Sequence, residues 1–95
     1  MSEFFELTMP VIIEAIQVKP DNEEELLKFG NGEFTVLANC GSVDRVLFSN
    51  PLGYMTCMLG DYILKGPDGI FYPSKRELFE QFYKKVDTAV GSQLQ

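Results

Sequence analysis

Short segments rich in apolar and β-branched residues alternate with turn signals through the middle of this chain, and this spacing limits the possible folds more than any other feature. The turn signals share glycine, mostly beside Asn, Asp or Pro, and lie at residues 31–32, 39–42, 50–53, 60–61 and 66–69. Short segments joined by such tight turns pair as antiparallel hairpins. The sequence therefore predicts paired strands at 33–38, 43–49, 54–59, 62–65 and 70–72.

The chain ahead of these strands has the pattern of a strand followed by a short helix. Residues 10–18 are apolar at nearly every position, which is typical of a strand covered on both faces. Pro20 then ends the strand, and Asp21 is a suitable N-cap for a helix that finishes at Gly30. We therefore expect one strand and one short helix before the hairpins.

A second helix is predicted near the C-terminus. Ser74 and Glu77 have the spacing of a capping box, and Pro73 keeps the chain extended just before it. The apolar residues after the box form a single helical stripe of Leu78, Phe79, Phe82, Tyr83 and Val86. A stripe of this kind predicts a helix that packs on the sheet.

Together these elements predict a small α+β domain with the order strand, helix, four or five strands, helix. Its sheet is mainly antiparallel, and the C-terminal helix packs on it. A chain of 95 residues has room for one core only. We assign residues 10–87 to this single domain, 1–9 to an acidic and apolar leader, and 88–95 to a flexible tail.

Composition excludes several classes of function. The chain has no histidine, which removes Ser–His and Cys–His nucleophile pairs, imidazole acid–base groups and His-ligated metal sites. We therefore expect no catalytic residues, no metal and no cofactor, and a protein that is not an enzyme. The net charge of −6 disfavours binding to nucleic acid or to anionic membranes, and no apolar run approaches the roughly 20 residues of a membrane span.

The two cysteines, Cys40 and Cys57, are too few and too far apart for a disulfide framework or a CxxC motif. Cys40 falls in a loop and should be reachable by solvent, whereas Cys57 lies within a strand and reads as a small core residue. Two reduced thiols are typical of a cytoplasmic protein.

One group of residues could bind a small ligand. Asp61 and Tyr62 place an acid beside an aromatic ring after a glycine, although the same residues also set a tight turn. Tyr72, Ser74 and Lys75 lie at the entrance of the second helix, whose positive end favours anions, although a tyrosine there also serves as packing. These five residues are the candidate ligand-binding set.

A different group could bind a protein partner. Glu23, Glu24 and Glu25 form an acidic run, which could attract a basic surface or simply complement the dipole of the first helix. Phe4 and Phe5 in the leader could anchor such a contact, or belong to the chain's own core or a disordered leader. These five residues are the candidate partner-binding set.

Two motifs bracket the domain. The first reads P-V-I-I-E-A-I-Q at residues 10–17, and the second reads G-D-Y-I-L-x-G at 60–66, with Y-P-x-K at 72–75 and aromatic rings at Phe79 and Tyr83. Both resemble the corresponding segments of a group of small, largely uncharacterised phage and prophage proteins. The resemblance covers about a third of the chain and implies a shared fold and a phage or prophage origin.

These observations lead to two hypotheses for function. The first is a phage or prophage accessory protein that works in the bacterial host cytoplasm as a non-enzymatic protein-interaction module and modulates a host protein. The alternative is a protein that binds or sequesters an anionic metabolite or nucleotide at the entrance of the second helix, in a form that could be a homo-oligomer.

Overall fold

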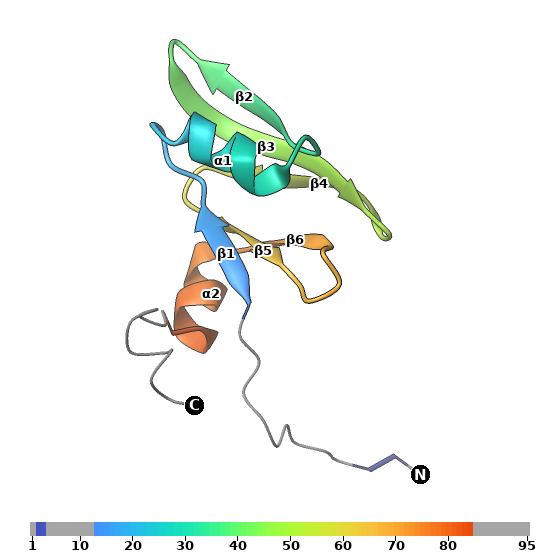
Figure 1. The fold of residues 1–95 in the computed structure, drawn as a ribbon. Helices are drawn as coiled ribbons and strands as arrows, with labels where there is room; N and C mark the ends of the chain where they lie inside the picture. The colour runs from blue at the N-terminus through green and yellow to red at the C-terminus, as the bar shows by residue number, and fades with distance from the viewer. Residues whose placement is uncertain (1, 4–12, 85–95) are drawn as a thin grey trace, which may run out of the picture.

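A computed structural model describes residues 2–3 and 13–84 of the chain (Figure 1). The elements follow the order β1 (Glu14–Gln17), α1 (Glu23–Gly30), β2 (Thr35–Asn39), β3 (Ser42–Asn50), β4 (Gly53–Met58), β5 (Tyr62–Lys65), β6 (Phe71–Ser74) and α2 (Arg76–Phe82). The predicted α+β class and the order strand, helix, five strands, helix are thereby confirmed. Apart from Ser2 and Glu3, the predicted leader and the predicted tail lie outside the described residues.

The strands form two antiparallel sheets of three strands each, with the orders β2-β3-β4 and β1-β5-β6. The sheets separate at the turn between β4 and β5, where the chain pairs with the end of the first strand instead of continuing the meander. There the Val18 amide donates to the Asp61 carbonyl at 2.9 Å, and the Gly60 amide donates to the Val18 carbonyl at 2.8 Å. The N-terminal strand thus supplies a partner that draws β5 away from β4.

β1 is less enclosed than its sequence predicts. It pairs with β5 in a register that places Ala15 opposite Leu64, and both Glu14 and Ala15 are exposed. A strand at the edge of a three-stranded sheet is not covered on both faces, so the apolar pattern overstates its burial. The start of the predicted strand, residues 10–12, lies outside the described residues.

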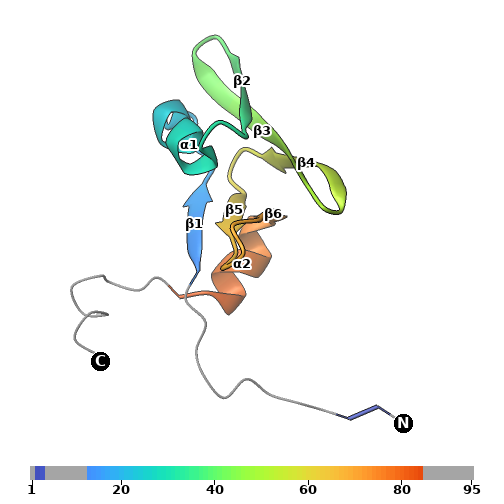
Figure 2. The same ribbon diagram turned by 45° about the vertical axis from the view of Figure 1, so that its right-hand side comes forward.

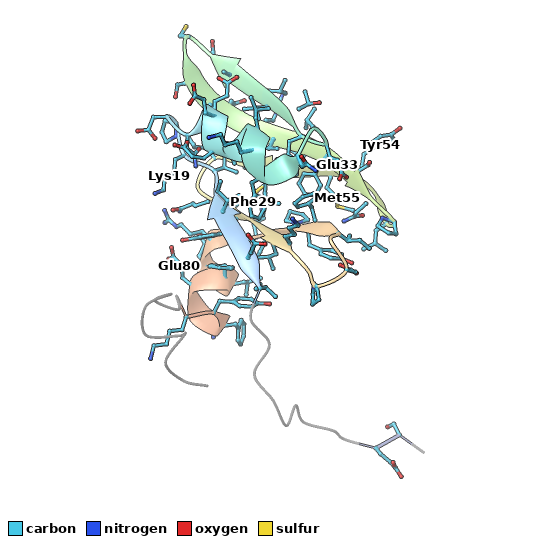
Figure 3. The ribbon with its side chains drawn as sticks, viewed as in Figure 1. Lys19, Phe29, Glu33, Tyr54, Met55 and Glu80 are labelled. Carbon is cyan, nitrogen blue, oxygen red and sulfur yellow. The ribbon has the colours of Figure 1, made fainter. Side chains whose placement is uncertain are left out.

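The core lies between the two sheets and under α1. Its buried side chains are Val18, Leu26, Phe34, Val43, Val46, Phe48, Cys57, Ile63 and Phe71. The centre is aromatic, since the centroid of the Phe34 ring lies 4.8 Å from that of Phe71 and 5.2 Å from that of Phe48. Figure 3 shows Phe29 and Met55 on the core side, whereas Tyr54 projects outward from β4 and is 96% exposed.

α1 packs on this core and begins one residue later than predicted. Its N-cap is Asn22 rather than Asp21, and no side chain caps the first amides. The Asn22 side chain instead braces the incoming chain, because its Oδ1 accepts from the Lys19 amide at 2.9 Å and its Nδ2 donates to the Gln17 carbonyl at 2.8 Å. The helix ends at Gly30, where an added Cβ would overlap the Phe34 ring, so a larger residue would displace that ring from the core.

α2 differs from its prediction at both its start and its buried stripe. β6 continues through Ser74, the N-cap is Lys75, and the predicted Ser74–Glu77 capping box does not form. The helix contacts the β1-β5-β6 sheet through Phe79, but none of its residues is buried. Val86, the last residue of the predicted stripe, lies outside the described residues. Figures 1 and 2 show α1 beside the β2-β3-β4 sheet and α2 beside the other sheet.

Candidate functional site

The five candidate ligand-binding residues lie together where β5, β6 and α2 meet. Antiparallel pairing sets Tyr62 opposite Ser74 and Leu64 opposite Tyr72. Because side chains on a strand alternate between faces, Tyr62, Tyr72 and Ser74 share one face of the sheet. Asp61 precedes β5 and Lys75 follows β6, so the same pairing brings both residues to the start of α2.

Asp61 is the acid that receives the start of α2. Its Oδ1 accepts a hydrogen bond from the Arg76 amide at 3.0 Å, and its Oδ2 lies 3.5 Å from Nζ of Lys75. Its side chain is only 17% exposed, against 69% for that of Lys75. A carboxylate that bonds a first-turn amide replaces the missing side-chain cap and complements the helix dipole. The positive end of α2, which could attract an external anion, is thus already occupied by the carboxylate of Asp61.

Tyr62 holds the middle of α2 to the sheet. Its ring stacks on Phe79 with centroids 3.9 Å apart, and Phe79 stacks in turn on Tyr83 at 4.9 Å. The Tyr62 hydroxyl donates to Oε2 of Glu80 at 3.1 Å. Partial burial, followed by this hydrogen bond to Glu80, raises the pKa of Tyr62 above its ordinary value of 10.0. The phenol therefore stays neutral at physiological pH and acts as a clamp on the helix.

One side of α2, next to the row that makes this clamp, is apolar and open to solvent. Leu78 is 54% exposed and Phe82 70%. We call these two residues the α2 apolar surface. Exposed large apolar side chains that gather on one helix mark interaction sites more often than scattered ones do.

Sequence reasoning placed the α2 apolar surface in the core. The signal that it missed is the width of the pattern, because Phe79 and Tyr83 form one i, i+4 row while Leu78 and Phe82 form a second row beside it. A helix of seven residues at one end of a three-stranded sheet can pack only one row against the sheet. The second row is left exposed.

The predicted partner-binding acids lie at a different place in the molecule. Glu23, Glu24 and Glu25 occupy the first turn of α1, and all three are exposed. Acids in the first turn of a helix complement its dipole, so this run stabilises α1 whether or not it also binds a partner. Phe4 and Phe5, the other two predicted partner-binding residues, lie outside the described residues.

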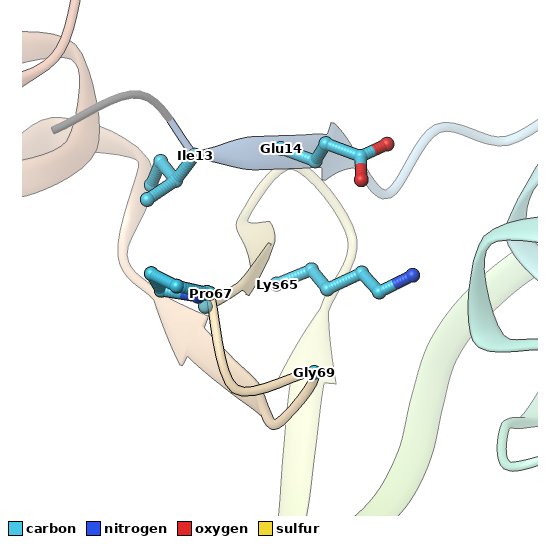
Figure 4. A pocket seen from close by; sticks show the side chains of 6 residues that line it. Ile13, Glu14, Lys65, Pro67 and Gly69 are labelled. Carbon is cyan, nitrogen blue, oxygen red and sulfur yellow. The ribbon is translucent and has the colours of Figure 1, made fainter.

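An open depression of about 260 Å³ lies at the opposite end of β5 (Figure 4). Its lining comprises Ile13, Glu14, Lys65, Gly66, Pro67 and Gly69. Glu14 and Lys65 are paired across β1 and β5, and Figure 4 shows their side chains extending in the same direction. None of the predicted ligand-binding residues lines this depression.

The two cysteines occupy opposite environments, as the sequence predicts. Cys40 is exposed in the β2–β3 turn, whereas Cys57 is buried and its Sγ donates to the Tyr62 carbonyl at 3.3 Å. Burial, with a smaller contribution from the negative charge of Asp61, raises the pKa of the Cys57 thiol from 9.0 to about 12. This thiol is therefore protonated at neutral pH and is a poor nucleophile.

Within residues 2–3 and 13–84, no three Cys, Asp or Glu side chains gather closely enough to hold a metal ion. The helices of the same part of the chain are too short and too polar to cross a membrane. Comparison of the chain with protein-family models, with curated proteins and with solved structures gives no match.

Proposed function

We propose that this protein is a non-enzymatic protein-interaction module that docks a protein partner on the α2 apolar surface. The observation that supports it is that α2 carries two rows of apolar residues, of which Leu78 and Phe82 remain more than half exposed. Leaving such residues in water costs about 25 cal/mol for each Å² of apolar area that a partner could cover. The motifs at both ends of the domain favour a phage or prophage accessory protein whose partner is a host protein in the bacterial cytoplasm.

The geometry suits docking because the helix is held in place before a partner arrives. The Asp61 carboxylate fixes its first turn, and the Tyr62–Phe79–Tyr83 stack fixes the row that faces the sheet. A helix that is already ordered loses little conformational entropy on binding. Leu78 and Phe82, four residues apart, have the spacing with which a helix inserts into an apolar groove.

Charge adds a preference among partners. The chain carries a net charge of −6, and the exposed run at Glu23–Glu25 concentrates part of it on α1. Because α1 lies beside the other sheet, these acids would act on a partner at long range while α2 makes the contact. Attraction between exposed charges raises the association rate more than the affinity, so we propose a partner with a basic surface.

The alternative hypothesis, capture of an anionic metabolite or nucleotide at the start of α2, has less support. The Arg76 amide and the Lys75 ammonium that would hold the anion already face Asp61. An incoming anion would have to displace this carboxylate or lie beside it, and like charges at that distance repel. We therefore favour the protein partner.

A pull-down from host lysate tests the proposal if the variants are matched. The test variant is Leu78→Ser with Phe82→Ser, and the control is Leu52→Ser with Tyr54→Ser, which alters two comparably exposed apolar residues on the β3–β4 hairpin. We expect one protein to be retained by the wild type and by the control, and to be lost with the test variant. Binding of that purified protein should weaken at least tenfold with the test variant.

Association rates then test the role of charge. Neutralising Glu23, Glu24 and Glu25 to Gln should slow association of the purified partner at 0.05 M salt and have little effect at 1 M, where the Debye length is about 3 Å. An association rate that changes neither with salt nor with these substitutions would contradict the proposal that these acids steer the partner. Equal retention by the test and control variants would reject the α2 apolar surface as the docking site.

A further inference from the structure

Four strands lie at the edges of the two sheets, and three of them are protected. β6 contains Pro73, which has no amide hydrogen, and its Phe71 carbonyl accepts from Nδ2 of Asn50 at 2.9 Å. β1 carries the exposed charge of Glu14, and β4 lies beside β6. Charge, proline and cover are the means by which proteins prevent edge strands from pairing with other chains.

β2 has neither charge nor proline, and although α1 contacts it, no backbone hydrogen bond joins the two within residues 13–84. Its sequence Thr-Val-Leu-Ala-Asn contains no charge and no proline. Within residues 13–84, the backbone of β2 is hydrogen-bonded to β3 and to no other segment. The irregularity in the β2–β3 register arises because Asp44 is an extra residue on β3, so β2 itself is continuous. One row of its N–H and C=O groups is therefore free to pair.

The sequence of β2 is compatible with its own copy. An antiparallel pair centred on Leu37 sets Val36 opposite Ala38 of the second copy and Thr35 opposite its Asn39. No charged residues face each other in this register, and Thr and Asn can hydrogen-bond across it. Opposed residues of an antiparallel pair lie on the same face of the sheet. Leu37 of one copy therefore lies beside Leu37 of the other on the outer face, and the core-facing sides of the two sheets point in the same direction.

We propose that two copies of this chain pair antiparallel through β2, which joins their β2-β3-β4 sheets into one six-stranded sheet. The contact uses a surface distinct from the α2 apolar surface, so it adds to the proposed function and does not depend on it. A dimer would present two α2 helices, and thereby raise the avidity for a partner that has two sites.

Sedimentation equilibrium tests the pairing. It is run at about 0.3 M NaCl, because salt screens the repulsion between two acidic chains. The test variant is Leu37→Lys, which opposes two ammonium groups at the centre of the pair. Its control is Thr56→Lys, which places the same charge on the same sheet face but on β4, opposite Leu47. The wild type and the control should sediment as dimers of the 10.8 kDa chain, and Leu37→Lys as a monomer.

Cysteine cross-linking provides a second measurement that does not require a charged variant. In a Cys40→Ser background, Leu37→Cys should form a disulfide-linked dimer under mild oxidation, since directly opposed residues lie within the Cα range of a disulfide. Thr56→Cys is the exposed control and should remain monomeric, and Cys57 is too buried to react.

Three results would overturn the proposal. The first is a wild-type chain that is monomeric at about 1 mM, and the second is a dimer that survives Leu37→Lys. The third is equal cross-linking of Leu37→Cys and Thr56→Cys. A dimer that is lost with Leu78→Ser and Phe82→Ser, but not with Leu37→Lys, would instead assign self-association to the α2 apolar surface. Leu37→Lys should bind the α2 partner with an unchanged intrinsic affinity, so this proposal and the proposed function fail separately.

Discussion

The two helices have similar sequence patterns but differ in how much of their surface they bury. Each is short, carries an acid in its first turn and has apolar residues at helical spacing. α1 buries Leu26 completely, whereas α2 buries none of its residues. The cause is position, because α1 covers the place where the two sheets meet, while α2 lies against the outer side of one small sheet. An amphipathic pattern therefore shows which side of a helix is apolar, and the neighbouring elements decide how much of that side is buried.

The helices also differ in what fixes them. α1 is held by burial, with its Phe29 ring 5.6 Å from that of Phe71 and 6.3 Å from that of Phe34. α2 is held at its base by Asp61 and along one row by the stack of Phe79 on Tyr62. A helix fixed by a cap and a stack can keep its other row free for a partner.

The largest expected effect comes from truncating Leu26, the one fully buried leucine among residues 13–84. Leu26→Ala should destabilise the protein by about 2–5 kcal/mol, because it removes buried methyl groups and leaves a cavity among the core rings. Phe82→Ala removes a larger side chain from α2 but should change the stability by less than about 0.5 kcal/mol, since that ring is 70% exposed. Urea unfolding followed by circular dichroism measures both values. Similar losses of unfolding free energy for the two variants would contradict the conclusion that α1 is part of the core and α2 is not.

The second expected effect is a loss of stability at alkaline pH. The Cys57 thiol ionises near pH 9 in the unfolded chain but only near 12 in the folded one, so above pH 9 the unfolded state binds fewer protons and is favoured. The difference in unfolding free energy between the wild type and Cys57→Ala should be constant below pH 9. It should then fall by up to about 1.4 kcal/mol per pH unit as the pH rises toward 12. Urea melts of both proteins between pH 8 and 11 check this, and a difference that does not change with pH would contradict the burial of the thiol.

A smaller effect is expected at the start of α2. Asp61→Ala removes the acceptor for the Arg76 amide and should cost about 1 kcal/mol, with a loss of helical signal from α2. Asp61→Asn retains an acceptor oxygen and should cost less. Ser74→Ala should be nearly neutral, because Ser74 ends β6 and does not cap the helix. If Ser74→Ala costs more than Asp61→Ala, the capping box predicted from the sequence is correct and the assignment of Asp61 is wrong.

Much of the fold was predictable because local chemistry determines it. Turn residues mark the ends of every hairpin, and β5 has the bounds that its pattern predicts. The division into two sheets was not predictable, since it depends on the pairing of Val18 with residues 60–61, about forty positions later. A local pattern holds no information about which distant segment offers a better partner.

The proximity of the candidate ligand-binding residues was predictable, but their contacts were not. The motif that contains Asp61, Tyr62 and Lys75 predicted residues that strand pairing brings together. The sequence did not show that Asp61 accepts a hydrogen bond at the helix end that was expected to attract a ligand. Leu78 and Phe82 were assigned to the core, since a sequence shows the apolar stripe of a helix but not the width of the sheet beneath it.

Hydrogen exchange at two matched amides tests the central claim, that α1 is part of the core and α2 is a surface helix with one free side. The Leu26 amide donates to the carbonyl of its N-cap Asn22 at 3.0 Å, and the Phe79 amide donates to the carbonyl of its N-cap Lys75 at 2.8 Å. The two amides occupy the same position in their helices, so a difference in protection reports packing. Leu26 should exchange only through global unfolding, whereas Phe79 should exchange through local opening at a free energy several kcal/mol lower. Equal protection of the two amides would show that α2 is as firmly packed as α1, and would contradict this account.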